Sequence, residues 1–164
     1  MKLSEAIVKV AAQEIGVEEV DGSNTGPRVN EYKAATTLDP KQSWPWCAAF
    51  VCWCVREGMK LAGVSETKTF KRPTTAGAFD FKRWSLEQDD STSTKSPHRN
   101  DIVSGDIVIF TFSHIGIATG SPNADGFVPT IEGNTDTAGS REGGGVFRKK
   151  RHVSKIGTRI RFTV

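Results

Sequence analysis

All three cysteines of this 164-residue chain lie in one stretch, SWPWCAAFVCWC, at residues 43–54. A thiol in such a stretch can pack in a core, bind a metal, form a disulfide or act as a nucleophile. On one helix Cys52 and Cys54 point to opposite sides, and Cys47 lies about 10 Å from Cys54, so neither pair has disulfide geometry. The histidines lack the paired spacing typical of zinc ligands (His98, His114 and His152). Packing and nucleophilic chemistry are the two interpretations left.

Position along the expected helix separates the three thiols. Cys52 and Cys54 lie in mid-helix among large apolar residues, where a thiol behaves as a small hydrophobic group. Cys47 lies in the first turn, where unpaired backbone N–H groups and the helix dipole favour the reactive thiolate. We therefore predict Cys47 as a nucleophile and the other two as core residues. Taken alone, a cysteine at a helix start is just as often structural.

A cysteine nucleophile needs a base, and the base needs an orienting partner. His114 begins the run HIGIATG, in which a period of two puts His114, Gly116 and Ala118 on one face, expected to face the helices. The run IEGNT supplies Glu132 and Asn134 at the end of the next strand, on the same side. Glu132 can hold the imidazole in its active tautomer, with Asn134 as helper or substitute. A lone His114 would instead be read as a satisfied core histidine.

The elements that must position these side chains follow from the pattern along the chain. Helical segments come first and short β-prone runs follow from residue 106, which predicts an α+β fold with N-terminal helices packed on an antiparallel sheet. The central helix is expected to start at Ser43 and Pro45, to be buried all round, and to stop or bend at Gly58. The other expected elements are helices over residues 3–15, 28–36 and 75–84, a polar loop over 88–100, and the strands DIVIFTF, HIGIATG, FVPTIEG, GGVFRKK and GTRIRF.

Length and composition predict one domain over residues 1–164. The longest apolar stretch is far shorter than the roughly 20 residues that span a bilayer, so the chain is not expected to cross a membrane. The first residues read as an amphipathic helix and not as a secretory signal. We therefore expect synthesis in the (host) cytoplasm.

Basic residues are concentrated near the C-terminus. The net charge is only +3, but residues 148–161 contain seven basic residues and no acidic one (Arg148, Lys149, Lys150, Arg151, Lys155, Arg159 and Arg161). The run is either a solvated strand face or a contact surface for an anionic polymer such as nucleic acid or the bacterial envelope.

The runs PWCAAFVCWC, SGDIVIF followed by SHIGIATG, TIEGNT and GGGVFRKKR resemble the CHAP family (cysteine, histidine-dependent amidohydrolases/peptidases). The resemblance covers nearly the whole chain and is least distinctive over residues 64–104. It implies a papain-like fold and peptidoglycan as the substrate, cleaved at an amide bond by an N-acetylmuramoyl-L-alanine amidase or an endopeptidase. The implied roles are Cys47 as nucleophile, His114 as base, and Glu132 with Asn134 as orienting residues.

Residues before the nucleophile refine this hypothesis. Some CHAP lysins bind calcium through several aspartates there, whereas this chain has only Asp39, so we expect neither calcium nor another metal or cofactor. Gln42 is the candidate second donor to the oxyanion, beside the backbone N–H of Cys47. Trp44 and Trp46 flank the nucleophile and can wall a substrate groove. Packing is an equal alternative for Trp46, and exposure of Trp44 would favour the groove.

The resemblance is to phage endolysins, which act on the wall after the membrane fails. The chain shows no appended wall-binding domain, so targeting is expected from the catalytic domain, with anionic envelope polymers held by Arg148, Lys149, Lys150 and Arg151. A monomer is expected. Two alternatives stay open: a thiol amidase or peptidase with another amide substrate, such as a toxin or processing enzyme, and a basic nucleic-acid-binding domain. The bond that is cut is also open.

Overall fold

The computed structural model describes residues 1–89, 91–95, 101–135 and 143–164. Among these residues four helices precede six strands, so the predicted α+β class is confirmed. The helices are α1 Leu3–Gln13, α2 Pro27–Lys33, α3 Cys47–Ala62 and α4 Asp80–Leu86. The strands are β1 Ser91–Lys95, β2 Ile107–Phe110, β3 Ile115–Ala118, β4 Phe127–Thr135, β5 Gly145–His152 and β6 Ile156–Phe162, with a 3₁₀ turn at Val153–Lys155 between the last two.

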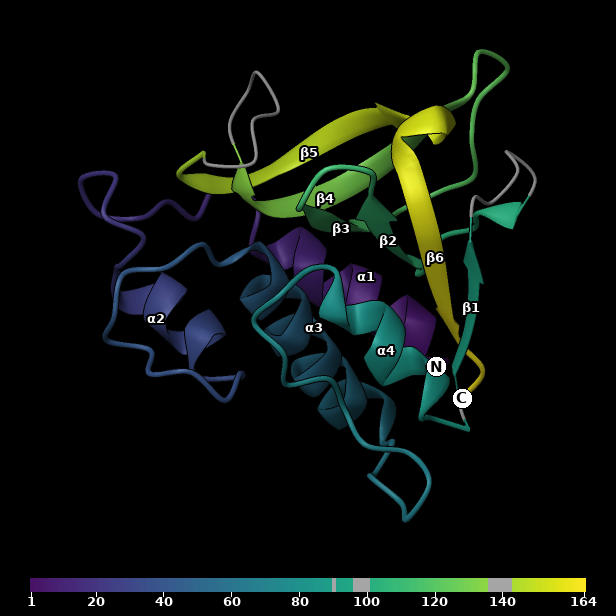
Figure 1. Ribbon diagram of the computed structural model, residues 1–164, viewed down its shortest axis with the longest axis horizontal. Helices are drawn as coiled ribbons and strands as arrows, with labels where there is room; N and C mark the ends of the chain where they lie inside the picture. Colours follow the sequence, from purple (N-terminus) through teal and green to yellow (C-terminus); the bar gives the residue numbers. More distant parts are fainter. Residues whose placement is uncertain (90, 96–100, 136–142) are drawn as a thin grey trace.

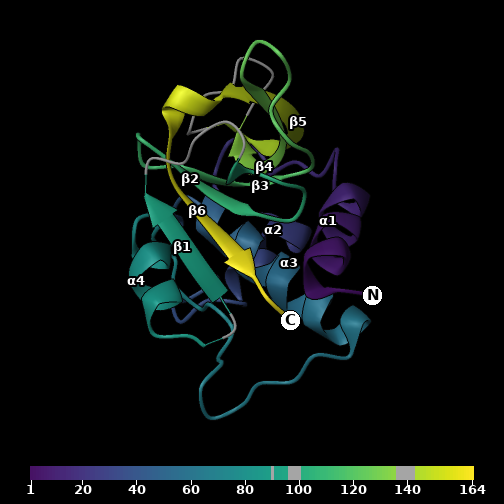
Figure 2. The same cartoon turned by 90° about the vertical axis from the view of Figure 1, so that its right-hand side faces the viewer.

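The strands form one antiparallel sheet in the order β1-β6-β2-β3-β4-β5. The helices cover one side of this sheet, with α3 between α1 and α2 (Figure 1). The chain ends lie side by side (Figure 2), where the Leu3 backbone N–H donates to the Val164 carbonyl at 3.1 Å. Among the described residues no helix is long and apolar enough to cross a membrane.

Both faces of the sheet are apolar, and strand alternation divides the residues between them. Ile115 and Ile117 of β3 belong to the main core between sheet and helices, together with Ile131 of β4. Ala118 and Val128 belong to a second, smaller cluster on the opposite face. The period of two expected for residues 114–118 is therefore confirmed, because successive side chains in a strand point to opposite faces.

Helix α3 is buried along its first half, as its apolar sequence predicts. Its bounds differ from the expectation. The N-cap is Trp46, so Cys47 is the first helical residue and Ser43 precedes the helix. Gly58 does not end the helix; a Cβ there would lie 2.9 Å from Ile7 Cγ1, so this glycine lets α1 approach closely. The helix ends at Gly63, whose φ of 70° is left-handed.

Two other expectations were wrong in detail. The segment read as a polar loop contains β1, which pairs with β6 along the edge of the sheet. Its sequence, STSTK, has no apolar alternation, and the pairing depends on the free edge of a distant strand. The helix expected from residue 75 begins at Asp80, because residues 75–79 are not helical and Gly77 packs against Asp80.

Candidate active site

His114, the residue before β3, and Glu132 of the neighbouring strand β4 form a buried pair. His114 Nε2 lies 2.8 Å from Glu132 Oε1, and both side chains are fully buried. Extended by one residue, the register of β3 with β4 places Gly116 opposite Glu132. A Cβ on Gly116 would lie 2.7 Å from Glu132 Cγ. Because glycine has no Cβ, the Glu132 side chain can pass over Gly116 and reach His114. The predicted contact between the two residues is present.

Three donors hold the carboxylate of Glu132. Arg151 of β5 donates from Nε to Oε2 at 2.9 Å and from Nη2 to Oε1 at 2.5 Å. The Thr130 hydroxyl donates to Oε2 at 2.6 Å, and His114 occupies the remaining direction of Oε1. Burial alone would raise the pKa of Glu132, but the hydrogen bonds from Arg151 and His114 outweigh it and lower this pKa to about 2.

Two aromatic rings pack against the imidazole and against each other. The rings of Phe110 and Phe112 are stacked with His114 at centroid distances of 5.6 and 5.9 Å and interplanar angles of 16° and 9°. The guanidinium of Arg151 lies over the same two phenylalanine rings, 5.1 and 5.5 Å from their centroids. Phe110 and Phe112 thus restrain the tilt of the imidazole ring. The contact between Nε2 and Glu132 restrains rotation of the ring about its bond to Cβ.

The proton arrangement of His114 follows from its partner. An ionised carboxylate only accepts hydrogen bonds, so Nε2 carries the proton and a neutral imidazole has its lone pair on Nδ1. Nδ1 is buried and has no hydrogen-bond partner within the described parts of the chain. A buried acceptor without a partner is rare in proteins and is the atom that a general base needs.

The face that carries His114 corrects the sequence expectation. His114 and Glu132 do not face the helices; they share the opposite face with Ala118. The reason is packing, because Ile115, Ile117 and Ile131 supply the apolar face that the helices cover. Strand alternation then sends the residues between them to the other side.

The start of α3 packs against β4 at Gly133, the residue next to Glu132. A Cβ on Gly133 would lie 2.7 Å from Phe50 Cβ and 2.9 Å from Trp46 Cζ3. The backbone next to Glu132 therefore lies directly on the first turn of α3, which begins at Cys47 (Figure 1). The glycine brings the helix start and the strand end together without a side chain between them.

The three thiols differ in burial, and none forms a disulfide. Cys47 is 6% exposed, whereas Cys52 and Cys54 are fully buried in the core, as predicted for those two. Burial raises the pKa of both core thiols. Neither of them is a nucleophile near neutral pH, since the reactive species is the thiolate.

Asn134 lies in an irregular part of β4. Its side chain is fully buried, and its φ of 55° is left-handed, a conformation that asparagine tolerates better than most residues. The register with β5 shifts between Glu132 and Thr135. Simple alternation, which predicted Glu132 and Asn134 on one side, therefore does not apply here, and the helper role of Asn134 stays a prediction.

The residues before Cys47 have mixed outcomes. The Trp46 indole is fully buried and donates to Glu19 Oε2 at 2.9 Å, so it packs in the core and walls no open groove. Trp44 is partly exposed, and Lys33 Nζ lies 5.0 Å from its ring centroid. Lys33 also donates to the carbonyl of Gln42, so this buried lysine ties down the loop before the nucleophile. Gln42 is exposed, and its role as an oxyanion donor stays a prediction.

Arg151 is the site residue that sequence reasoning misassigned. Its place in the basic run predicts an envelope contact, yet its guanidinium binds the Glu132 carboxylate. Arg161 of the same run is paired with Asp106. One signal in the sequence could have separated Arg151 from its neighbours. If RKKRH pairs with the strand FVPTIEG, a period of two puts Arg151 on the opposite face of the strand from the exposed residues Arg148 and Lys150.

No protein-family model and no curated protein matches the chain. Among solved structures it is similar to the wild-type endolysin LysIME-EF1, with a TM-score of 0.57 and 18% sequence identity. The similarity covers 99% of this chain. The fold of the chain resembles that of this endolysin. It spans 65% of the length of that endolysin chain, and at this identity the similarity establishes the fold, so the chemistry must be argued from the site.

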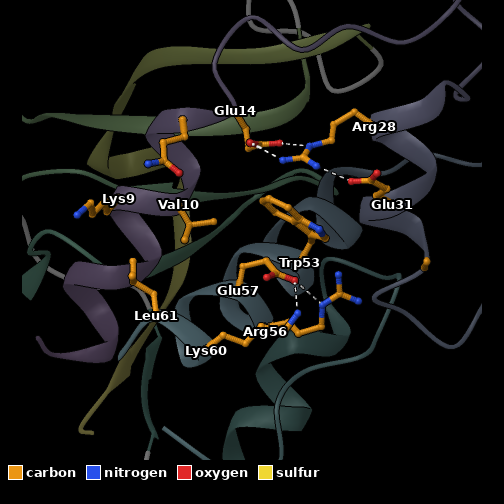
Figure 3. Close-up of a pocket in the computed structure, with 12 residues that line it drawn as sticks. Lys9, Val10, Glu14, Arg28, Glu31, Trp53, Arg56, Glu57, Lys60 and Leu61 are labelled. Atoms are coloured by element: carbon orange, nitrogen blue, oxygen red, sulfur yellow. Dashed lines mark hydrogen bonds and ion pairs between the residues drawn. The ribbon is translucent and has the colours of Figure 1, made fainter. Parts of the chain in front are cut away.

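A concave feature lies away from this site, between α1, α2 and α3. It is an open depression of about 810 Å³, in which Arg28 bridges Glu14 and Glu31 (Figure 3). Glu57 holds two basic side chains of α3 in the same way. These charges neutralise one another, and neither Cys47 nor the His114 pair lines the depression. Within the described residues no three His, Cys, Asp or Glu side chains gather as metal ligands.

Proposed function

We propose that this protein is a CHAP-type peptidoglycan hydrolase that cleaves an amide bond of the wall peptide with a cysteine nucleophile and a histidine base. The observation that carries the proposal is the buried His114–Glu132 pair, 2.8 Å apart, on the strands next to the helix that begins at Cys47. The endolysin fold supports peptidoglycan as the substrate.

Each step of the proposed reaction has a residue to perform it. The Cys47 thiol transfers its proton to His114 Nδ1, and the sulfur attacks the amide carbonyl carbon. The oxyanion accepts a hydrogen bond from the unpaired backbone N–H at the helix start, with Gln42 as proposed second donor. The C–N bond then breaks as His114 protonates the leaving amine. Water hydrolyses the thioester, gives its proton to Nδ1, and releases the thiol.

The proposed substrate bond is either the muramoyl-L-alanine amide or a peptide bond of the stem or bridge. A thiol amidase with another amide substrate would use the same residues, and the products distinguish the two functions. Nucleic-acid binding is less well supported, because Arg151 and Arg161 of the basic run are paired with Glu132 and Asp106.

The test is digestion of purified cell wall, followed by mass spectrometry of the released muropeptides. We expect new amine termini at one type of amide bond. Cys47→Ala should abolish release, and Cys52→Ala is the matched control in the same helix, expected to keep activity and to lose about 1 kcal/mol of unfolding free energy. Release by folded Cys47→Ala, or alkylation of Cys52 in place of Cys47 by iodoacetamide, would refute the assignment.

A further inference from the structure

We propose that Arg151 is a positioning residue of this site: its guanidinium fork fixes the Glu132 carboxylate and thereby keeps the proton of His114 on Nε2 and the lone pair on Nδ1. The inference rests on the proposed function, because it assigns to Arg151 a part in the same reaction. Arg151 has no contact of its own with the reacting atoms in the proposed mechanism; it acts through Glu132.

The geometry of the contact is that of a planar fork on a carboxylate. Arg151 Nε and Nη2 bind the two oxygens of Glu132 at 2.9 and 2.5 Å, so the carboxylate plane is defined by the guanidinium plane. His114 shares Oε1 with Nη2, and Thr130 shares Oε2 with Nε. A fork of this kind sets the orientation of the glutamate lone pair to which Nε2–H points.

Arg151 is itself held in place. It pairs with Val128 in the sheet register, reaches along the face of β4 toward Glu132, and lies over the rings of Phe110 and Phe112. Those rings also stack on His114. One guanidinium therefore contacts both the carboxylate and the aromatic stack that confine the imidazole. Lysine cannot reproduce this arrangement, because its ammonium group is a point charge on a flexible stem.

The charge of Arg151 decides the protonation of Glu132. Without a cation nearby, a fully buried carboxyl has a raised pKa and stays protonated at pH values well above the ordinary pKa. A protonated carboxyl can itself donate a hydrogen bond, so it no longer requires the His114 proton to be on Nε2. Within the described residues, the charged or titratable groups that act on Glu132 are His114 and Arg151, and Lys149 is the next residue of β5 on the same face. Arg151 is the cation that makes two hydrogen bonds to the carboxylate.

The experiment compares Arg151→Met and Arg151→Lys with Arg83→Met, an exposed arginine of α4. The Glu132 carboxyl is titrated by ¹³C NMR, the imidazole nitrogens of the wild type are assigned by ¹⁵N NMR, and kcat and KM are measured on soluble muropeptides. For Arg151→Met we expect kcat to fall by about 100-fold with KM unchanged, and the Glu132 pKa to rise by two units or more, roughly. Arg151→Lys should recover part of the pKa change and little of kcat, and Arg83→Met should match the wild type.

The NMR measurements need no substrate, so they separate this inference from the proposed function. A protein without wall activity whose Glu132 pKa still depends on Arg151 would contradict the proposed function and support the control of Glu132 by Arg151. A fall in kcat with an unchanged Glu132 titration would reduce Arg151 to a structural role and overturn the inference. So would a wild-type imidazole proton on Nδ1. If Arg151→Met does not fold, Arg151→Lys carries the same comparison, because any rise in the Glu132 pKa then reflects loss of the fork alone.

Discussion

Glu132 is the residue at which the charge balance of the site is set. Its carboxylate is fully buried, yet it stays ionised because a cation and two further donors surround it. A buried ion pair of this kind contributes little net stability when it forms, but removal of one partner leaves an uncompensated charge. The pair therefore orients an imidazole more than it strengthens the fold.

The low pKa of Glu132 predicts how stability depends on pH. A carboxyl with a folded pKa of about 2 and an unfolded pKa near 4.3 stabilises the folded state fully above roughly pH 4.3. This contribution, on the order of 3 kcal/mol, is lost as the pH falls through about 2. Urea unfolding of the wild type and Glu132→Gln at a series of pH values measures it. The wild type should lose more free energy of unfolding between about pH 5 and 2 than the variant, and parallel curves would contradict the assigned charge.

At the scale of elements, the contact between β4 and the start of α3 joins the two halves of the proposed site. The helix supplies Cys47 and the strand supplies Glu132, and Gly133 is the point at which they touch. Because the nearest atoms are Phe50 Cβ and a Trp46 ring carbon, both buried, neither can move without shifting the helix.

Gly133→Ala should therefore separate helix and strand. We expect a loss of about 1–3 kcal/mol in unfolding free energy from overpacking, and a fall in wall hydrolysis larger than the loss of folded protein explains. Gly157→Ala in β6 is the matched control, because a Cβ there would meet its nearest atom, the Ile109 carbonyl oxygen, at an ordinary 3.7 Å. Denaturant unfolding and wall digestion measure both effects. Full activity of folded Gly133→Ala would show that this close approach does not position the nucleophile.

For the molecule as a whole, the basic run divides into two groups with different roles. Arg151 and Arg161 are committed to the carboxylates of Glu132 and Asp106. Arg148 and Lys150 are exposed on the edge strand β5. We propose that only exposed members of the run hold the anionic envelope. The proposed contact surface is therefore smaller than the whole basic run of residues 148–161.

Neutralising the exposed pair should weaken binding to whole walls. Arg148→Gln with Lys150→Gln is expected to lower the affinity and to flatten its dependence on salt, because fewer charges remain to be screened. The control is Lys9→Gln with Lys68→Gln, which removes the same charge from exposed positions elsewhere. Sedimentation with purified walls at several salt concentrations gives the affinities, and cleavage of soluble muropeptides should be unchanged. Equal losses in the two double variants would assign the effect to net charge and would end the targeting proposal.

Local patterns were sufficient for the order of the helices and of strands β2 to β6, the buried first half of α3 and the alternation of β3. Each of these depends on residues a few positions apart, such as the apolar run after Cys47 or the isoleucines at 115 and 117. The same local rules also brought His114 and Glu132 into view as partners, because neighbouring strands and a period of two were enough to suggest the contact.

Other features depend on which distant surfaces meet, and no local pattern specifies that. The face of His114 was decided by the helices, which cover the isoleucine side of the sheet and leave the imidazole on the other. Arg151 joined the site because β5 pairs with β4 in one register, whereas in the sequence it is one cation among seven. Gly58, taken for a helix stop, proved to be a contact with α1. In each case the local sequence allows several arrangements of similar free energy, and burial of the shared core selects one of them.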